Sequence, residues 1–95
     1  MKVKVLYLGV LRSKTGKKSE KYEIAEGSSL SDLLEILSSK YSKGLKEIFK
    51  VNEKSVLDPT VIATVNGVSK DLSRSKNVKL KDGDTVALMS LISGG

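Results

Sequence analysis

The 95-residue sequence contains no cysteine and no histidine. Without cysteine there is no disulfide framework and no thiolate nucleophile. Without histidine, a Ser-His-Asp triad and most transition-metal sites are excluded. The phosphate-binding motifs G-x-x-x-x-G-K-[ST] and G-x-G-x-x-G are also missing. We therefore expect a binding or carrier protein that is not itself an enzyme and that binds no cofactor or metal of its own.

Long apolar segments are lacking as well. No run of about 18 apolar residues occurs, so a membrane-spanning helix is not expected. The first ten residues, MKVKVLYLGV, alternate between polar and apolar side chains and have no small-residue cleavage site, unlike a signal peptide. We expect one domain over residues 1–95, located in the cytoplasm and without a membrane partner.

Basic residues exceed acidic ones, with 17 Lys and Arg against 11 Asp and Glu and a formal net charge of +6. This balance raises the question of nucleic-acid binding. Only two of the basic residues are arginines, and aromatic residues make up 4% of the chain, whereas proteins that read bases rely on arginine and stacking aromatics. We interpret the lysines as a solvated surface that maintains solubility and do not expect a nucleic-acid partner.

The first part of the sequence predicts a β-hairpin. Residues 2–10 alternate in part and are rich in valine, which is typical of a strand. The segment SKTGKKSE (13–20) is typical of a turn, and KYEIAEG (21–27) predicts a second strand.

The stretch SSLSDLLEILSSKYSKG (28–44) predicts a helix. Ser29 is a favourable N-cap, and Asp32 resembles the acidic member of a capping box. Gly44 is a favourable C-terminal stop. The apolar side chains recur at spacings of three and four along one helical face, which is formed by Leu30, Leu33, Leu34, Leu37 and Tyr41.

The remaining sequence predicts a second hairpin and a last strand. Residues 45–60 show no clear pattern beyond one short helical turn. Residues 61–72 return to strand patterning, in which Asn66-Gly67 indicates a type I′ turn because both central residues need a positive φ angle. A turn at 82–84 leads into a last strand at 85–92.

Asp82 and Asp84, in the turn before the last strand, raise the question of a catalytic or metal-binding pair. Two carboxylates without histidine or further ligands make a poor cation site. Aspartates that flank a glycine are typical of a tight turn, and we adopt this interpretation.

These elements predict an α+β domain that has a mixed sheet with one main helix packed on one face. The helix has a single apolar stripe and needs the sheet as its partner. We expect the first and last strands to lie side by side in the middle of the sheet.

This arrangement divides the side chains of the two central strands between two faces. Those that face the helix are Val3, Val5, Tyr7, Val86 and Leu88. The opposite face then carries an exposed apolar patch, formed by Leu6, Leu8, Met89 and Leu91. Exposed apolar patches mark protein interfaces, and methionine adapts to several partners. We therefore expect a partner to dock on this patch.

Two other interpretations of this surface stay open. A shift of one residue in the register would exchange the two faces. Residues 41–60 could instead cover the patch. Arg12, just past the first strand, is a candidate contact for an acidic partner, and a solvated arginine is at least as plausible.

Four segments follow one another along the chain: VKVLYLGVLR, EGSSLSDLLEIL, ATVNG and LKDGDTVALMSLISGG. In this order they resemble the β-grasp, ubiquitin-like proteins, and in particular their sulfur-carrier branch. The resemblance rests on their order and on the final Gly-Gly, because no single segment is specific. The branch includes the small subunit of molybdopterin synthase, the thiamine-pathway sulfur carrier and the ubiquitin-related modifiers. The chain most resembles the first of these and its archaeal modifier relatives.

The resemblance implies a β-grasp fold and a function for Gly94 and Gly95. In this branch an adenylating enzyme of the ubiquitin-activating type uses ATP to couple the terminal carboxylate to AMP. A persulfide then yields a thiocarboxylate, or a lysine amine forms an isopeptide bond. We expect residues 93–95 to form a flexible tail, whose glycines lack Cβ atoms and so fit a narrow channel.

The resemblance also implies two kinds of partner. The first is the activating enzyme. The second is either a sulfur acceptor enzyme, for molybdopterin synthesis or tRNA thiolation, or a set of target proteins that offer lysines. The sequence does not separate sulfur donation from conjugation. The alternative is a non-covalent β-grasp interaction module whose Gly-Gly is incidental, and deletion of Gly95 would leave the function of such a module intact.

Overall fold

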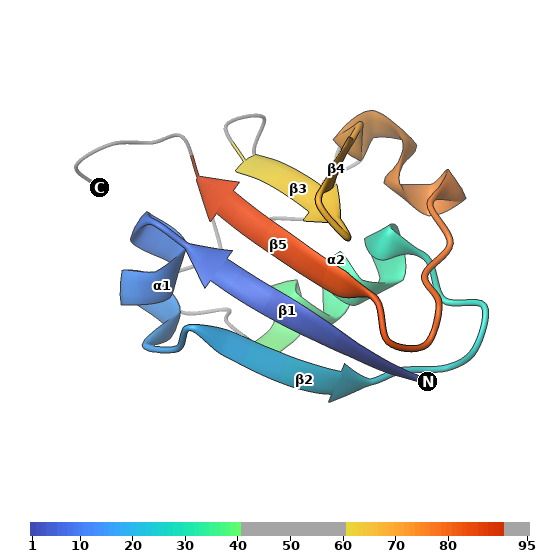
Figure 1. The fold of residues 1–95 in the computed structure, drawn as a ribbon, viewed down its shortest axis with the longest axis horizontal. Coiled ribbons are helices and arrows are strands. Elements are labelled where there is room, and N and C mark those ends of the chain that lie inside the picture. Colours follow the sequence, from blue (N-terminus) through green and yellow to red (C-terminus); the bar gives the residue numbers. More distant parts are fainter. Residues whose placement is uncertain (41–60, 91–95) are drawn as a thin grey trace.

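The computed structural model describes residues 1–40 and 61–90 of the chain. A five-stranded sheet with the order β2-β1-β5-β3-β4 forms its centre (Figure 1). The strands are β1 (Lys2–Leu8), β2 (Ser19–Glu23), β3 (Val61–Val65), β4 (Val68–Lys70) and β5 (Thr85–Ser90). The helices are α1 (Val10–Thr15), α2 (Leu30–Lys40) and the 3₁₀ helix η1 (Leu72–Asn77).

The two central strands come from the two ends of the described chain. β1 pairs with β5 in parallel, whereas β2, β3 and β4 are joined to the sheet by antiparallel pairing. The sheet is therefore mixed, and the prediction that the first and last strands are central neighbours is confirmed.

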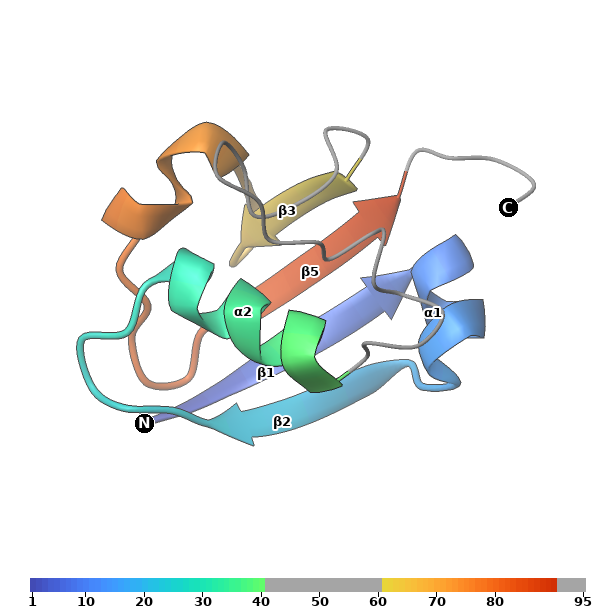
Figure 2. The same cartoon turned by 180° about the vertical axis from the view of Figure 1, so that it is seen from behind.

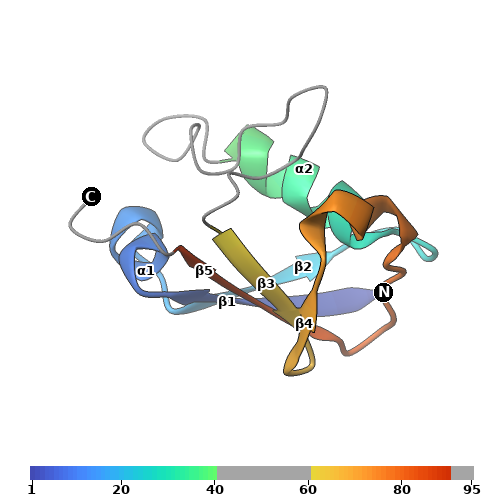
Figure 3. The same ribbon diagram turned by 90° about the horizontal axis from the view of Figure 1, so that it is seen from above.

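Helix α2 lies across one face of the sheet (Figure 2). We name the face that α2 covers the inner face and the opposite one the outer face; Figure 3 shows the sheet edge-on, with α2 and η1 on the same side of it. Four leucines of α2 have no exposed surface: Leu30, Leu33, Leu34 and Leu37. They pack against buried residues of β1, β3 and β5, so the predicted α+β architecture is confirmed.

The start of α2 carries the predicted capping box. The Ser29 hydroxyl accepts a hydrogen bond from the Asp32 backbone N–H at 3.2 Å, and the Asp32 carboxylate accepts one from the Ser29 N–H at 2.9 Å. Two N–H groups that a helix leaves without partners are thereby satisfied. The predicted end of this helix, with Tyr41 and Gly44, lies outside the described residues. The same holds for residues 45–60.

The first hairpin differs from the prediction at its connection. The strand expected over 2–10 ends at Leu8, and the helix α1 occupies part of the expected turn. Gly9 has a φ of 62° and a ψ of −133°, a combination that glycine adopts without steric cost. Leu11 follows with no exposed surface. Burial of this side chain stabilises the packing of the short helix against the rest of the protein.

The second strand and the region before β5 also differ from the prediction. β2 spans Ser19–Glu23 rather than 21–27, because the chain turns after Ile24, whose N–H donates to the Met1 carbonyl at 2.9 Å. The strand patterning expected to residue 72 ends at Lys70, where Asp71 caps η1 by accepting a hydrogen bond from the Ser73 N–H. The helix η1 was not predicted from the sequence pattern.

The second hairpin follows the prediction. Asn66 and Gly67 have φ angles of 52° and 84°, the positive values that a type I′ turn requires. The Asn66 side chain also accepts a hydrogen bond from the Thr85 N–H at 2.9 Å. The turn between β3 and β4 is thereby attached to the start of β5.

A polar cluster joins β1, β2 and the end of α2. The phenol of Tyr7 donates to Glu20 Oε1 at 2.9 Å, and the phenol of Tyr22 donates to the same oxygen at 3.0 Å. The ammonium groups of Lys17 and Lys40 pair with Glu20 Oε2. Burial, followed by the hydrogen bonds to Tyr22 and Glu20, raises the pKa of the Tyr7 phenol above its ordinary value.

None of the helices described within residues 1–40 and 61–90 combines the length and the apolar character that a membrane span requires.

Replacing Asp32 with alanine removes the acceptor of the Ser29 N–H. We expect Asp32→Ala to lower the free energy of unfolding by about 1 kcal/mol, measured by urea denaturation. Glu35→Ala, an exposed acidic position one turn later in α2, is the matched control. An equal loss of stability in the two variants would contradict the capping role.

The raised pKa of Tyr7 gives the stability a pH dependence. The native state retains the phenol proton above pH 10, where the unfolded state releases it. The contribution of Tyr7 is therefore complete below about pH 10 and is lost as the pH rises further. We expect the stability of the wild type to fall more steeply than that of Tyr7→Phe, by about 1.4 kcal/mol per pH unit.

Urea midpoints measured between about pH 8 and pH 11.5 cover this range. The two profiles should run parallel below pH 10 and diverge above it. Profiles that stay parallel throughout would show that burial does not hold the proton on Tyr7.

Candidate functional site

The outer face brings together three of the residues predicted to dock a partner. The parallel register pairs Leu8 with Met89 and Leu6 with Ala87. Leu6 and Leu8 are half-buried, and Met89 is 36% exposed. The side chains predicted to face the helix are all buried: Val3, Val5, Tyr7, Val86 and Leu88. The division of the two central strands between the faces follows the prediction.

Ile62, which was not predicted from the sequence pattern, extends this group. The antiparallel register of β3 with β5 pairs Ile62 with Met89. Its neighbour Ala63 is buried on the inner face, and alternation along the strand places Ile62 on the outer face. We name Leu6, Leu8, Ile62 and Met89 the apolar cluster. Only the register could have revealed Ile62, because the β3 sequence has apolar residues on both faces.

The apolar cluster lies near the end of β5 from which the chain continues to residue 91. Leu8 and Met89 are at or near the C-terminal ends of β1 and β5, which run in the same direction. Leu91, Gly94 and Gly95 lie outside the described residues. Their predicted roles therefore stay predictions, as does the alternative in which residues 41–60 cover the patch.

Arg12 lies in α1, beyond the end of β1. Its Nε–H donates to the Tyr7 carbonyl at 3.4 Å, and its side chain is exposed. This contact holds the Arg12 side chain near the end of β1. Its predicted docking role is not tested by this geometry.

Asp82 and Asp84 form a turn, as expected. One Asp82 oxygen accepts from the Lys2 N–H at 2.7 Å, and one Asp84 oxygen accepts from the Lys81 N–H at 2.8 Å. The second Asp84 oxygen accepts from the Asn66 amide at 2.9 Å. Among the described residues, no group of three or more acidic side chains could hold a metal ion.

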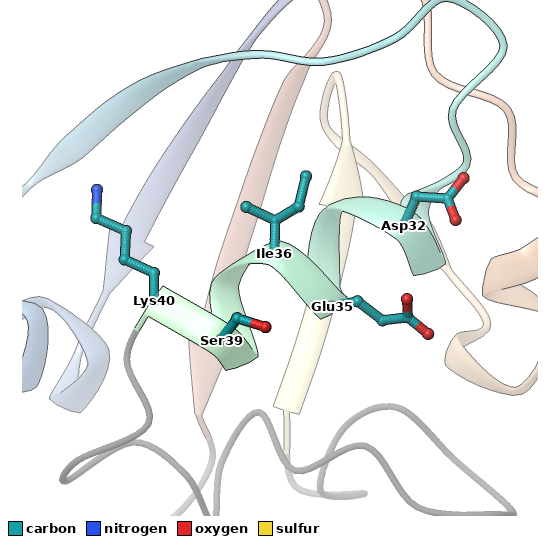
Figure 4. A pocket seen from close by; sticks show the side chains of 5 residues that line it. All are labelled: Asp32, Glu35, Ile36, Ser39 and Lys40. Carbon is teal, nitrogen blue, oxygen red and sulfur yellow. The ribbon is translucent and has the colours of Figure 1, made fainter.

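A surface depression of about 640 Å³ lies along the exposed side of α2 (Figure 4). The described residues that line it all belong to this helix: Asp32, Glu35, Ile36, Ser39 and Lys40. Figure 4 shows the two carboxylates towards the start of the helix and Lys40 at its end. Since Asp32 is used in the capping box and Lys40 pairs with Glu20, these side chains do not converge as a catalytic site does.

The mixed sheet, with parallel central strands and a helix across one face, is the architecture of the β-grasp, ubiquitin-like proteins. The model of the ThiS family matches residues 5–95. The chain therefore belongs to the ThiS family.

Several known proteins are similar to the chain. Ubiquitin-related modifier 1 of Eremothecium gossypii is 29% identical over 99 residues, which cover 100% of this chain and 99% of the relative. The solution structure of small archaeal modifier protein 1 from Methanosarcina acetivorans is 28% identical, with a TM-score of 0.76 over 99% of this chain and 96% of that one. A chain of the Amycolatopsis orientalis BexX/CysO complex is 26% identical, with a TM-score of 0.67 over 98% of this chain and 99% of that one.

Neighbouring residues of β5 test the assignment of the two faces. We expect Leu88→Ala, in a fully buried position, to cost about 2–5 kcal/mol of stability. Met89→Ala, on the outer face, should cost less than about 1 kcal/mol. Urea denaturation measures both. A reversed order would show that the faces are exchanged.

Proposed function

We propose that this protein is a ubiquitin-like sulfur carrier and protein modifier whose working group is the carboxylate of Gly95. The observation that carries the proposal is the match to the ThiS family, which extends over residues 5–95 and so includes Gly94 and Gly95. Two relatives similar over nearly their whole length are named as modifiers, one as ubiquitin-related and one as archaeal.

The proposed chemistry begins with activation of the carboxylate. A carboxylate oxygen of Gly95 attacks the α-phosphorus of ATP, which forms an acyl-adenylate and releases pyrophosphate. Both ATP and the catalytic groups belong to an adenylating enzyme of the ubiquitin-activating type. The chain itself supplies only the acyl group, in agreement with the absence of cysteine and histidine from its sequence.

The acyl-adenylate then has two fates. A persulfide sulfur displaces AMP and forms an acyl-persulfide, and a second thiol reduces the S–S bond to leave the thiocarboxylate and a disulfide. A lysine amine can instead displace AMP, lose a proton and form an isopeptide bond. The first route donates sulfur, for molybdopterin or for thiolated tRNA, and the second tags target proteins. Both routes share the activation step.

The apolar cluster has a defined part in this scheme. An enzyme that holds residues 91–95 must also contact the surface near the end of β5, where Leu8 and Met89 lie opposite each other. Burial of these side chains would provide binding energy without involving the reacting end. The crystallised complex of CysO with BexX is an example of a relative bound to a second protein.

ATP–pyrophosphate exchange with the purified activating enzyme of the same organism tests the proposal. We expect exchange with the wild type and none with a variant that lacks Gly95, because an altered end does not reach the adenylation site. The double variant Leu8→Glu/Met89→Glu should raise the KM for the carrier by about tenfold or more, since it places charges in an apolar contact.

The single variants Met89→Glu and Ile36→Glu form a matched pair, because the two apolar side chains are comparably exposed, 36% and 39%, and Ile36 belongs to α2 on the other side of the sheet; only Met89→Glu should raise the KM. Circular dichroism checks that every variant is folded. Absence of exchange with the wild type, or unchanged exchange after deletion of Gly95, would overturn the proposal in favour of a non-covalent interaction module.

A further inference from the structure

Three lysines lie together on the outer face, at the opposite end of β1 from the apolar cluster. The antiparallel register places Lys4 directly opposite Lys21, and Lys2 is two residues before Lys4 on the same face. All three side chains are exposed. With Val3, Gly83 and Thr85 they line a depression of about 360 Å³. We name Lys2, Lys4 and Lys21 the basic cluster.

The pairing of Lys4 with Lys21 in the basic cluster is unfavourable for the isolated protein. Like charges directly opposite each other in a sheet are destabilising. Among the described residues, both ion pairs involve Glu20 and neither involves a lysine of this cluster. Glu23, opposite Lys2, is the one carboxylate that the register places beside them on this face. Asp82 and Asp84, in the adjoining turn, already accept hydrogen bonds from backbone N–H groups.

The outer face therefore changes character along one strand. Lys2, Lys4, Leu6 and Leu8 share the same face of β1, so positive charge gives way to apolar surface towards the strand end. Lys4 and Leu8 are four residues apart, about 13 Å along the strand. A single protein surface of ordinary size covers both clusters at once. α2 and η1 lie on the other side of the sheet, away from the face that carries both clusters (Figure 3).

The neighbouring apolar cluster favours a protein over a nucleic acid as the occupant. Nucleic-acid surfaces combine positive charge with arginine or with aromatic side chains that stack on bases. The described residues of the outer face include neither, because the apolar ones are leucine, isoleucine, methionine and alanine. Apolar side chains gain most from burial against a protein, whereas the lysines gain most from carboxylates.

We propose that the basic cluster pairs with an acidic patch on the activating enzyme, about 13 Å from the apolar contact that holds the end of β5. The inference rests on the proposed function, since it names the surface chemistry of the enzyme that activates Gly95. Exposed charges at the edge of an interface act mainly on encounter and orientation. The cluster therefore determines the KM for the carrier and leaves the kcat of adenylation unchanged.

The test reverses the charge of the directly opposed pair. In Lys4→Glu/Lys21→Glu like charges remain directly opposite each other, and circular dichroism checks that the variant is folded. ATP–pyrophosphate exchange is measured against carrier concentration at about 25 mM and about 300 mM NaCl. We expect the KM to rise by about tenfold at low salt, the rise to shrink at high salt, and kcat to stay constant.

Lys76→Glu/Lys79→Glu is the control, because it changes the same number of charges at exposed positions, one of them in η1 on the other side of the sheet. Its KM should stay within about twofold of the wild type. A single Lys4→Gln variant should unfold at a higher urea concentration than the wild type at low salt, because it removes the repulsion between Lys4 and Lys21.

Three results would overturn the inference. The first is an equal change of KM in the two double variants. The second is an effect on KM that does not depend on salt. The third is a normal KM accompanied by lost binding of total tRNA, which would assign the lysines to nucleic acid. If the wild type supports no exchange at all, the proposed function fails and this inference fails with it. In the other three cases the wild type supports exchange, so only the inference fails.

Discussion

Parallel pairing of β1 with β5 is the interaction on which the rest of the structure depends. It joins strands from the two ends of the chain, and the register from Lys4–Thr85 to Leu8–Met89 aligns their alternating faces. The inner face thereby receives the valines, tyrosine and leucine that α2 covers. The outer face receives what is left, which is lysine at one end and apolar surface at the other. A shift of one residue would exchange both sets.

The same pairing places the two clusters at opposite ends of one face. Because the two strands run in the same direction, the apolar cluster lies where β5 ends, and the basic cluster lies where β1 begins, beside the turn at Gly83. Binding energy and reactive chemistry are therefore separated. In the proposed function the sheet is the surface on which the enzyme docks, while the reaction takes place at Gly95 in the active site of that enzyme. Such a carrier needs no nucleophile, base or cofactor of its own.

Much of this fold could be predicted from the sequence, because its signals are local. The capping pair Ser29 and Asp32, the Asn66-Gly67 turn and the leucine stripe of α2 depend on residues within one or two turns of each other. α1 was missed because the conformation of Gly9 and the burial of Leu11 depend on tertiary packing. Ile62 and the basic cluster were missed for a related reason, since strand registers bring these residues together. The role of the final glycines was predicted from the family resemblance, because no pattern of burial or charge indicates it.

The most direct test of the central claim is the intact mass of the protein purified from its native host. The account predicts a species in which one sulfur replaces one oxygen, or conjugates in which Gly95 is joined to lysines of other proteins, and neither in a strain whose copy lacks Gly95. An unmodified mass throughout, in a strain where deletion of Gly95 has no consequence, would contradict it.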